Sequence, residues 1–223
     1  MSKRVLVAGA SRGIGLALVR ALVDRGDEVW AGVRHVTSEL EAIASARLHV
    51  LTLDVSSDAS VREAARECLV DALDVVIANA AVNGGPQRAP GMDLERVARV
   101  IDTNAAGPVR LYDAFVERVR KARGAWINVS SESGSLGTFR ASSKPEYAMS
   151  KAALNAFTRW AAAVETEVRV ISLDPGWTQT AMGGAKATYT TEQTATRIVA
   201  MIDRLRPEDH GRFIDCEGKD VGW

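Results

Sequence analysis

The chain has 223 residues, of which 47% are hydrophobic, and it carries 28 basic and 28 acidic side chains. This length and apolar content favour one domain with a sizeable core, so we expect a single domain over residues 1–223. A formal net charge of zero gives no general field for binding nucleic acid or an anionic membrane surface. Met1–Arg4 leads into an apolar run too short for a secretion signal or a membrane span, so we expect a cytoplasmic protein. Cys68 and Cys216 have no metal-ligand spacing, so neither a metal site nor a disulfide framework is predicted.

Short runs rich in Val, Ile and Leu recur along the chain, and turn residues or charges bound each of them. We expect these seven runs to form strands: Arg4–Ala8, Glu28–Val33, Leu48–Leu53, Asp74–Ala78, Ala125–Val129, Val168–Leu173 and Gly211–Asp215. Between them, for example in Ile14–Leu22 and Val61–Leu69, apolar residues return every three or four positions, which is typical of helices. Ser57 is positioned to cap the second of these helices.

The alternation of strands and helices continues through the whole chain without a linker or a repeat. Several predicted strands are apolar at consecutive positions, as a parallel sheet covered on both faces requires. The pattern therefore predicts an α/β fold: one doubly wound, Rossmann-type domain with a seven-stranded, mostly parallel sheet and helices on both faces. Ligands bind such sheets beyond the ends of the strands, so Asn83–Gly91 and Ser133–Pro145, which follow the fourth and fifth strands, are expected near the site.

A glycine-rich loop directly follows the first predicted strand. Glycines permit a tight turn and let backbone N–H groups at the start of the next helix approach a pyrophosphate. A glycine triplet elsewhere would indicate an ordinary turn, but its place after the first strand of an α/β chain favours dinucleotide binding. The cofactor-binding residues predicted in this loop are Gly9, Ser11, Arg12, Gly13, Ile14 and Gly15.

The end of the second predicted strand lacks the carboxylate that would accept hydrogen bonds from the ribose diol of NAD. Arg34 occupies this place, and Arg12 projects from the glycine loop. Two guanidinium groups can hold a 2′-phosphate through bidentate, charge-assisted hydrogen bonds. A single arginine would be an ordinary surface residue, but the pair favours NADPH/NADP+ as the cofactor.

Tyr147 and Lys151 lie four residues apart in a predicted helix, which places a phenol beside an ammonium group. Such pairs also arise by chance on helix surfaces, but this one follows Ser130-Ser131 at the end of the fifth strand. Delivery of hydride to a carbonyl carbon leaves charge on the oxygen, which must be stabilised and protonated. Because a free phenol titrates near ~10, a nearby cation is needed to stabilise its ionised form. We expect Tyr147 to exchange the proton and Lys151 to supply the cation.

Taken in order, these segments resemble those of the short-chain dehydrogenase/reductase family. The glycine loop is similar to the family's TGxxxGxG pattern, with Ala8 in place of the threonine. Ser131–Gly134 and Tyr147–Asn155 are similar to its SxxG and YxxxKAALN segments. The resemblance extends over nearly the whole chain and rests on the ordered combination of motifs.

The resemblance assigns roles to further residues. It implies that Ser131 orients the substrate oxygen, that Lys151 also contacts the nicotinamide ribose, and that Asn104 holds a water in a proton relay. The stretch between the serine and the tyrosine is longer than is common in the family, so Ser130 and Ser133 are alternatives to Ser131.

Additional cofactor contacts follow from the same resemblance. Ala78–Ala81 is similar to the family's NNAG segment, and Asp174–Thr180 is similar to its PGxxxT segment. Asp54 is similar to the family's adenine-contacting aspartate, although it could also be a helix-capping or turn residue. The further predicted cofactor-binding residues are Asp54, Val55, Asn79, Ala80, Tyr147, Lys151, Pro175, Gly176, Thr178 and Thr180.

Within the family, Pro175–Gly184 and the ending Gly211–Trp223 are similar to C-factor and sniffer-like carbonyl reductases. This similarity implies an NADPH-dependent enzyme that reduces a ketone or an aldehyde, or oxidises an alcohol in reverse. An NADPH-binding signalling or sensor protein with little turnover is the alternative, and an epimerase or dehydratase on the same scaffold is another.

Family members usually pair through the helix that carries the tyrosine, so we expect a homodimer or a homotetramer. Apolar residues available for that contact, unless they face the sheet, are Leu154, Phe157, Trp160 and Ala161. The candidates for lining the substrate pocket are Trp177, Met182, Phe139 and Tyr189.

Overall fold

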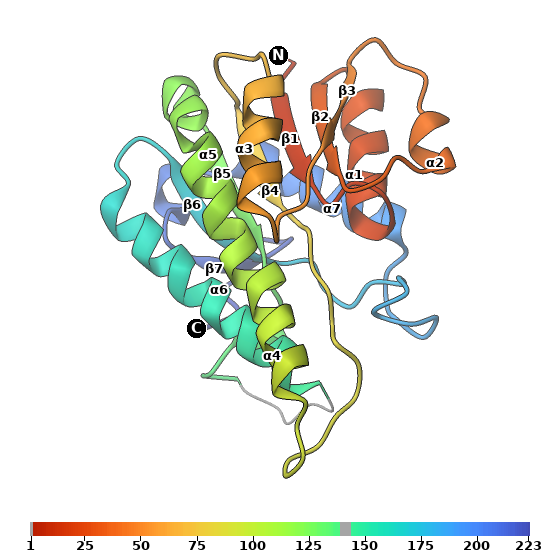
Figure 1. Ribbon diagram of the computed structural model, residues 1–223. Coiled ribbons are helices and arrows are strands. Elements are labelled where there is room, and N and C mark those ends of the chain that lie inside the picture. The colour runs from red at the N-terminus through yellow and green to blue at the C-terminus, as the bar shows by residue number, and fades with distance from the viewer. Residues whose placement is uncertain (1, 139–143) are drawn as a thin grey trace.

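The seven apolar runs of the sequence form the strands of one sheet in the computed structural model, which describes residues 2–138 and 144–223. The strands are β1 (Arg4–Ala8), β2 (Glu28–Val33), β3 (Leu48–Thr52), β4 (Val75–Ala78), β5 (Ala125–Val129), β6 (Arg169–Asp174) and β7 (Phe213–Asp215). Their order is β3-β2-β1-β4-β5-β6-β7, and every pairing is parallel (Figure 1). The predicted fold class is confirmed, and no strand end differs from its prediction by more than two residues.

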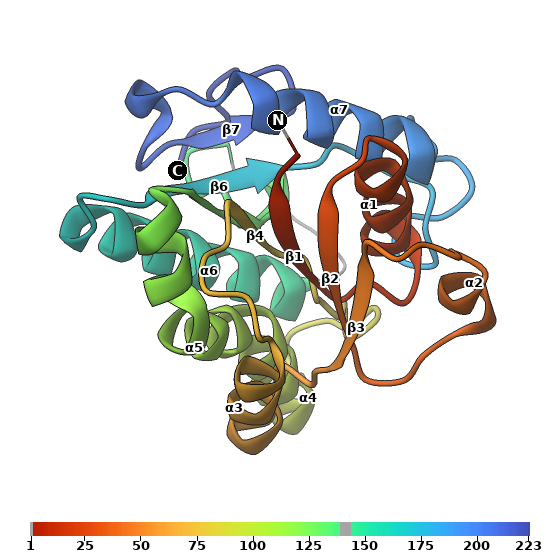
Figure 2. The same cartoon turned by 90° about the horizontal axis from the view of Figure 1, so that it is seen from above.

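Helices cover both faces of this sheet. They are α1 (Gly13–Asp24), α2 (Ser38–Glu41), α3 (Asp58–Glu67), α4 (Leu94–Ile101), α5 (Gly107–Ala122), α6 (Pro145–Val164) and α7 (Thr191–Arg204). Seen from above, α1 and α7 lie on one side of the strands, whereas α3, α4, α5 and α6 lie on the other (Figure 2). Ser57 caps α3 as predicted, because its hydroxyl accepts a hydrogen bond from the Ser60 N–H at 3.3 Å. No helix in the described part of the chain is long and apolar enough to span a bilayer.

The strands contribute to two apolar clusters, one on each face of the sheet. In β1, Val5 and Val7 pack into the cluster beneath α1 and α7, whereas Leu6 and Ala8 pack into the cluster beneath α3, α5 and α6. All four side chains are fully buried. The consecutive apolar positions of this strand are explained by this burial, since adjacent residues of a strand point to opposite faces.

The parallel order brings the loops that follow β1, β4, β5 and β6 to one edge of the sheet. A π-helical turn, Asp102–Ala106, joins α4 to α5 near this edge and carries Asn104 inward, where it has no exposed surface. A short 3₁₀ turn, Glu132–Gly134, follows β5. The fold thus gathers the glycine loop, Asn104 and the start of α6 around the same edge.

Candidate active site

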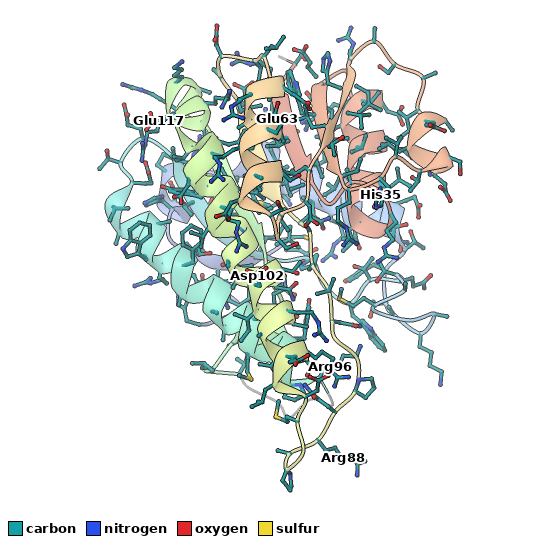
Figure 3. The ribbon with its side chains drawn as sticks, viewed as in Figure 1. His35, Glu63, Arg88, Arg96, Asp102 and Glu117 are labelled. Atoms are coloured by element: carbon teal, nitrogen blue, oxygen red, sulfur yellow. The ribbon has the colours of Figure 1, made fainter. Side chains whose placement is uncertain are left out.

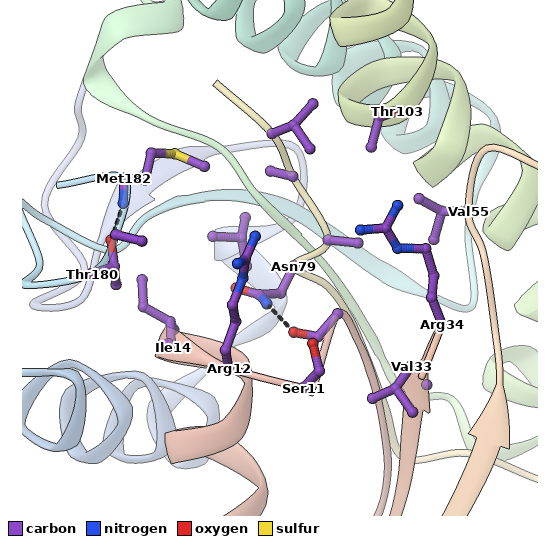
Figure 4. Close-up of a pocket in the computed structure, with 18 of the residues that line it drawn as sticks. Ser11, Arg12, Ile14, Val33, Arg34, Val55, Asn79, Thr103, Thr180 and Met182 are labelled. Carbon is purple, nitrogen blue, oxygen red and sulfur yellow. Dashed lines mark hydrogen bonds between the residues drawn. The ribbon is translucent and has the colours of Figure 1, made fainter. Parts of the chain in front are cut away.

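A cavity of about 530 Å³ opens at the carboxyl-terminal edge of the sheet, within the range typical of small-ligand sites (Figure 4). The predicted site residues that line it are Gly9, Ser11, Arg12, Gly13, Ile14, Arg34, Asp54, Val55, Asn79, Ala80, Tyr147, Lys151, Pro175 and Thr180. The structure therefore brings the glycine loop, both arginines and the Tyr-Lys pair to one cavity. The predicted residues outside this lining are Gly15, Asn104, Ser131, Gly176 and Thr178.

Several residues that line the cavity were not among the site residues predicted from the sequence. They are Gly32, Val33, Leu53, Ser56, Ala81, Val82, Thr103, Val129, Gln179, Ala181 and Thr191. Most of them adjoin a predicted residue at the end of a strand, so the positions of the strand ends were the available signal. Thr103 adjoins the predicted Asn104 in the π-helical turn, whereas Thr191 comes from the start of α7, where no local pattern pointed to it.

The glycine loop requires glycine because its backbone packs against its neighbours. Gly9 has φ +83°, and a Cβ there would lie 2.6 Å from the Cα of Ala80. A Cβ at Gly15 would collide with the carbonyl oxygen of Gly9. The Asn79 side-chain amide donates to that same oxygen at 3.0 Å, tying the end of β4 to the loop. Gly15 therefore packs against the loop backbone and does not line the cavity, whereas Gly9 does.

The two arginines reach the cavity from different elements, Arg12 from the loop after β1 and Arg34 from the end of β2 (Figure 4). Asp54 lies in the same lining, and its carboxylate accepts hydrogen bonds from the N–H and the hydroxyl of Ser56. Burial acts to raise the pKa of Asp54, but the Ser56 bonds and the Arg34 charge bring it below the ordinary value. This end of the cavity therefore combines two guanidinium groups with an ionised carboxylate.

Tyr147 and Lys151 project from the first two turns of α6. The Lys151 amine lies 5.6 Å from the centre of the Tyr147 ring and donates to the Val129 carbonyl at 2.7 Å. The turn that carries Gly134 packs closely on α6 at Lys151, and glycine is needed there because a Cβ would lie 2.6 Å from the Lys151 backbone. The end of β5 and the turn that follows it therefore fix the amine beside the phenol.

Burial is the largest cause of the pKa shifts of Tyr147 and Lys151. It raises the pKa of Tyr147 to about 12, with the Asp174 charge adding to the rise and a hydrogen bond with Ser131 opposing it. It lowers the pKa of Lys151 to about 7. We expected the Lys151 cation to lower the pKa of the Tyr147 phenol, but this pKa is raised. The reason is that desolvation disfavours the charged form of both side chains.

Three serines were candidates for the residue that orients the substrate, and the structure places them differently. Ser131 lies close enough to the Tyr147 phenol to lower its pKa, and its Oγ accepts the Ser133 N–H at 3.1 Å. Ser130 lines the cavity, but its hydroxyl donates to Asn155 at 2.7 Å and is buried. Ser133 is exposed in the 3₁₀ turn. The contact with the phenol favours Ser131 among the three.

Asn104 connects three segments around the Tyr-Lys pair. Its Oδ1 accepts the Val82 N–H at 2.8 Å, and its Nδ2 donates to the Val82 carbonyl at 2.7 Å and to Ser150 Oγ at 2.9 Å. Ser150 in turn donates to the Tyr147 carbonyl at 2.8 Å. The side-chain amide thus holds the loop after β4 against α6, and this geometry assigns it a positioning contact in addition to the expected relay.

Hydrogen bonds within the loop after β6, and from this loop to α7, hold it in place. Thr178 is buried and pairs with Thr194 at 2.8 Å, so its hydroxyl points away from the cavity. The Trp177 indole donates to the Gly183 carbonyl at 2.9 Å while 57% of the residue remains exposed.

Of the side chains expected to line a substrate pocket, Met182 lines the cavity, whereas Trp177 and Tyr189 do not. Tyr189 packs against Gly176 behind the loop. Phe139 lies outside the described residues.

Comparison with known sequences identifies the family. The sequence model for short chain dehydrogenases matches residues 3–190, and the chain belongs to this family. An uncharacterized oxidoreductase of Schizosaccharomyces pombe is 34% identical over 247 aligned positions, covering 97% of this chain and 96% of the relative. The C-signal protein of Myxococcus xanthus is 36% identical over 157 positions, covering 68% of this chain and 93% of that protein.

Solved structures place the chain beside the carbonyl reductases of the family. The NADPH-bound carbonyl reductase from chicken fatty liver superposes with a TM-score of 0.91 at 28% identity, over 100% of this chain and 99% of that one. The carbonyl reductase Sniffer of D. melanogaster superposes with a TM-score of 0.93 over 100% of both chains, and at 24% identity this likeness supports the fold. The resemblance predicted from the motifs is therefore confirmed at the level of the family and its carbonyl reductase branch.

Proposed function

We propose that this protein is an NADPH-dependent oxidoreductase that reduces a ketone or an aldehyde, and oxidises the corresponding alcohol in reverse. The observation that carries the proposal is the shared cavity: Tyr147 and Lys151 line the same space as the glycine loop and the two arginines. A phenol and an amine beside a dinucleotide-binding loop suit a reaction that moves a proton together with a hydride.

The residues present fit a nicotinamide dinucleotide phosphate. The left-handed backbone at Gly9 and Gly13 and the start of α1 direct N–H groups towards a pyrophosphate. Arg12 and Arg34 would hold the 2′-phosphate, since both line the cavity and carry bidentate donors. Asp54 would lie at the adenine end, and Asn79, Pro175 and Thr180 would lie nearer the nicotinamide. When bound, the cofactor supplies the hydride.

The protein's own residues would manage the substrate oxygen. With a pKa of about 12, Tyr147 keeps its proton at neutral pH, which suits a proton donor in the reductive direction. Ser131 lies beside this phenol, whose pKa it lowers, and would donate to the substrate oxygen, orienting the carbonyl. Lys151 would stabilise the phenolate left after proton transfer, and its pKa of about 7 lets it gain or lose a proton near neutral pH.

The C-signal likeness favours one alternative, an NADPH-binding signalling or sensor protein with little turnover. Such a role needs the cofactor cavity but does not need the phenol to donate a proton. The two functions therefore separate on a Tyr147→Phe variant, which retains the aromatic ring and loses the hydroxyl.

We also infer a cytoplasmic homodimer or homotetramer that uses part of α6. Leu154 and Ala161 are fully buried against the chain's own core, so these two are not available for pairing. Trp160 is 58% exposed and stacks on Phe157 with ring centres 6.0 Å apart. Light scattering of wild type and a Trp160→Asp variant tests the assembly: a fall in mass for the variant supports pairing through α6, and a monomeric wild type refutes it.

The deciding experiment for the proposed function is absorbance loss of NADPH, and separately of NADH, with a panel of ketones and aldehydes. We expect faster consumption of NADPH, and a Tyr147→Phe rate lower by roughly a hundred- to ten-thousandfold, the range of general acid catalysis. NADPH binding without reduction of any carbonyl would favour the signalling protein. Faster consumption of NADH would refute the role given to Arg12 and Arg34.

A further inference from the structure

A buried carboxylate and a partly exposed arginine form an ion pair between α4 and α6, outside the cavity lining. Glu146 immediately precedes Tyr147 in α6, and its side chain has no exposed surface. Nε of Arg96, from α4, lies 3.3 Å from its Oε1 (Figure 3). Neither carboxylate oxygen accepts a hydrogen bond from any described residue. Arg96 is therefore the opposite charge that faces this carboxyl group, and a buried charge is costly unless it is paired.

The same pair holds the segment that follows β4. The Arg96 guanidinium donates to the Pro86 carbonyl at 3.3 Å as well as facing Glu146. The backbone of Gly84 packs directly on the Glu146 carboxylate, where a Cβ would collide with Oε1. Arg96 and Glu146 thus join α4, α6 and the loop between β4 and α4 at one point.

This loop begins at the cavity. Val82 lines the cavity, and both its N–H and its carbonyl are held by Asn104. The loop continues to Arg88, which is exposed and lies at the end of the loop farthest from the sheet (Figure 3). Asn104 fixes the loop where it leaves the cavity, and the charge pair fixes it a few residues later.

We propose that Arg96 and Glu146 are positioning residues, whose ion pair holds residues 82–93 against α6 and so sets the distance between the cavity wall at Val82 and Tyr147. The inference rests on the proposed oxidoreductase function and deepens it on the substrate side of the site. Loss of Arg96 leaves the Glu146 carboxylate buried without compensation, and loss of Glu146 removes the opposite charge that holds the partly exposed Arg96, so either change favours opening of the loop towards water. Neither Arg96 nor Glu146 is among the described residues that line the cavity, whose pyrophosphate end is built from the loop after β1.

The test compares Arg96→Met, Glu146→Gln and the double variant with wild type. Arg99→Met is the matched control, because Arg99 lies on the same helix and forms an exposed ion pair with Glu95 at 3.7 Å. For each protein we would measure kcat and KM for the best carbonyl substrate, the Kd for NADPH, and the rate of trypsin cleavage after Arg88. All measurements are made below the onset of thermal unfolding of the least stable variant.

We expect each single variant to raise KM by on the order of tenfold or more, because a misplacement of about 1 Å at a site can cost a hundredfold. The Kd for NADPH should stay within about twofold of wild type. Cleavage after Arg88 should accelerate in the single variants, remain at the wild-type rate in Arg99→Met, and slow again in the double variant, in which no charge is stranded.

Two results would overturn the inference. One is an unchanged KM and an unchanged cleavage rate in both folded single variants, which would make the pair a packing feature only. The other is a Kd for NADPH that rises in step with KM, which would show a general loss of the site. If wild type reduces no carbonyl, the proposed function fails by itself, while the cleavage rates still decide whether the pair holds the loop.

Discussion

Replacement of Lys151 with Met tests the physical cost of placing an amine in this site. Burial lowers the pKa of Lys151 from its ordinary 10.5 to about 7. One pKa unit corresponds to about 1.4 kcal/mol, so at pH 7, where about half of the folded protein carries the charge, the lowered pKa costs the fold roughly 4 kcal/mol. The Met side chain avoids that cost but removes the hydrogen bond to the Val129 carbonyl, worth about 1–3 kcal/mol when the acceptor stays buried. We therefore expect Lys151→Met to be inactive and yet more stable than wild type by about 2 kcal/mol at pH 7.

Whether the Lys151→Met variant is more or less stable than wild type depends on pH. Between pH 7 and 10.5 the folded protein binds fewer protons at Lys151 than the unfolded chain does, so wild-type stability rises with pH across this window. The Met variant lacks that rise, and its advantage should vanish and then reverse as the pH approaches 10.5. Urea unfolding of the cofactor-free proteins at several pH values measures the difference, with Lys121→Met, an exposed lysine of α5, as the control. A Met variant that is less stable than wild type by the same amount at every pH would show that Lys151 is charged in the folded protein.

Two further substitutions probe groups that support the Tyr-Lys pair. Asp174→Asn removes a negative charge that raises the pKa of Tyr147, so the pH for half-maximal alcohol oxidation should fall; an unchanged or higher midpoint would contradict this coupling. Asn104→Ala removes the hydrogen-bond partner of the buried Ser150 hydroxyl and of both partly buried backbone groups of Val82. Unfolding in urea should show a loss of roughly 3 kcal/mol, since an unpaired group costs about 1–3 kcal/mol when buried and less where water reaches it. A loss below about 1 kcal/mol would show that water replaces the amide.

Local sequence patterns were sufficient to predict the strands and the central residues of the site. Parallel strands buried on both faces give consecutive apolar residues, and this signal placed all seven strands to within two residues. Glycine spacing after the first strand and the four-residue spacing of Tyr147 and Lys151 are also local, because a turn and a helix fix the relative directions of nearby residues. The structure then placed both features in one cavity.

The environment of each side chain could not be predicted in this way. Thr178 belongs to a motif segment that follows the sixth strand, yet its hydroxyl turns inward to Thr194 of α7. The pKa of Tyr147 is raised, opposite to the expectation from its neighbouring lysine, because desolvation is its largest cause and the lysine charge is not among the causes of the shift. Burial depth depends on elements that are distant in the sequence, and spacing within a motif does not report it.

The sequence by itself determined the fold class, the cofactor loop and the Tyr-Lys pair, because each depends on residues within a few positions of one another. Only the tertiary structure decided the supporting contacts, since Asn104 meets Val82 and Ser150 across three segments, and Arg96 meets Glu146 across two helices. Such pairings arise from how helices and loops pack on the sheet, and the free energy of a buried polar group is set by the partner that packing brings to it.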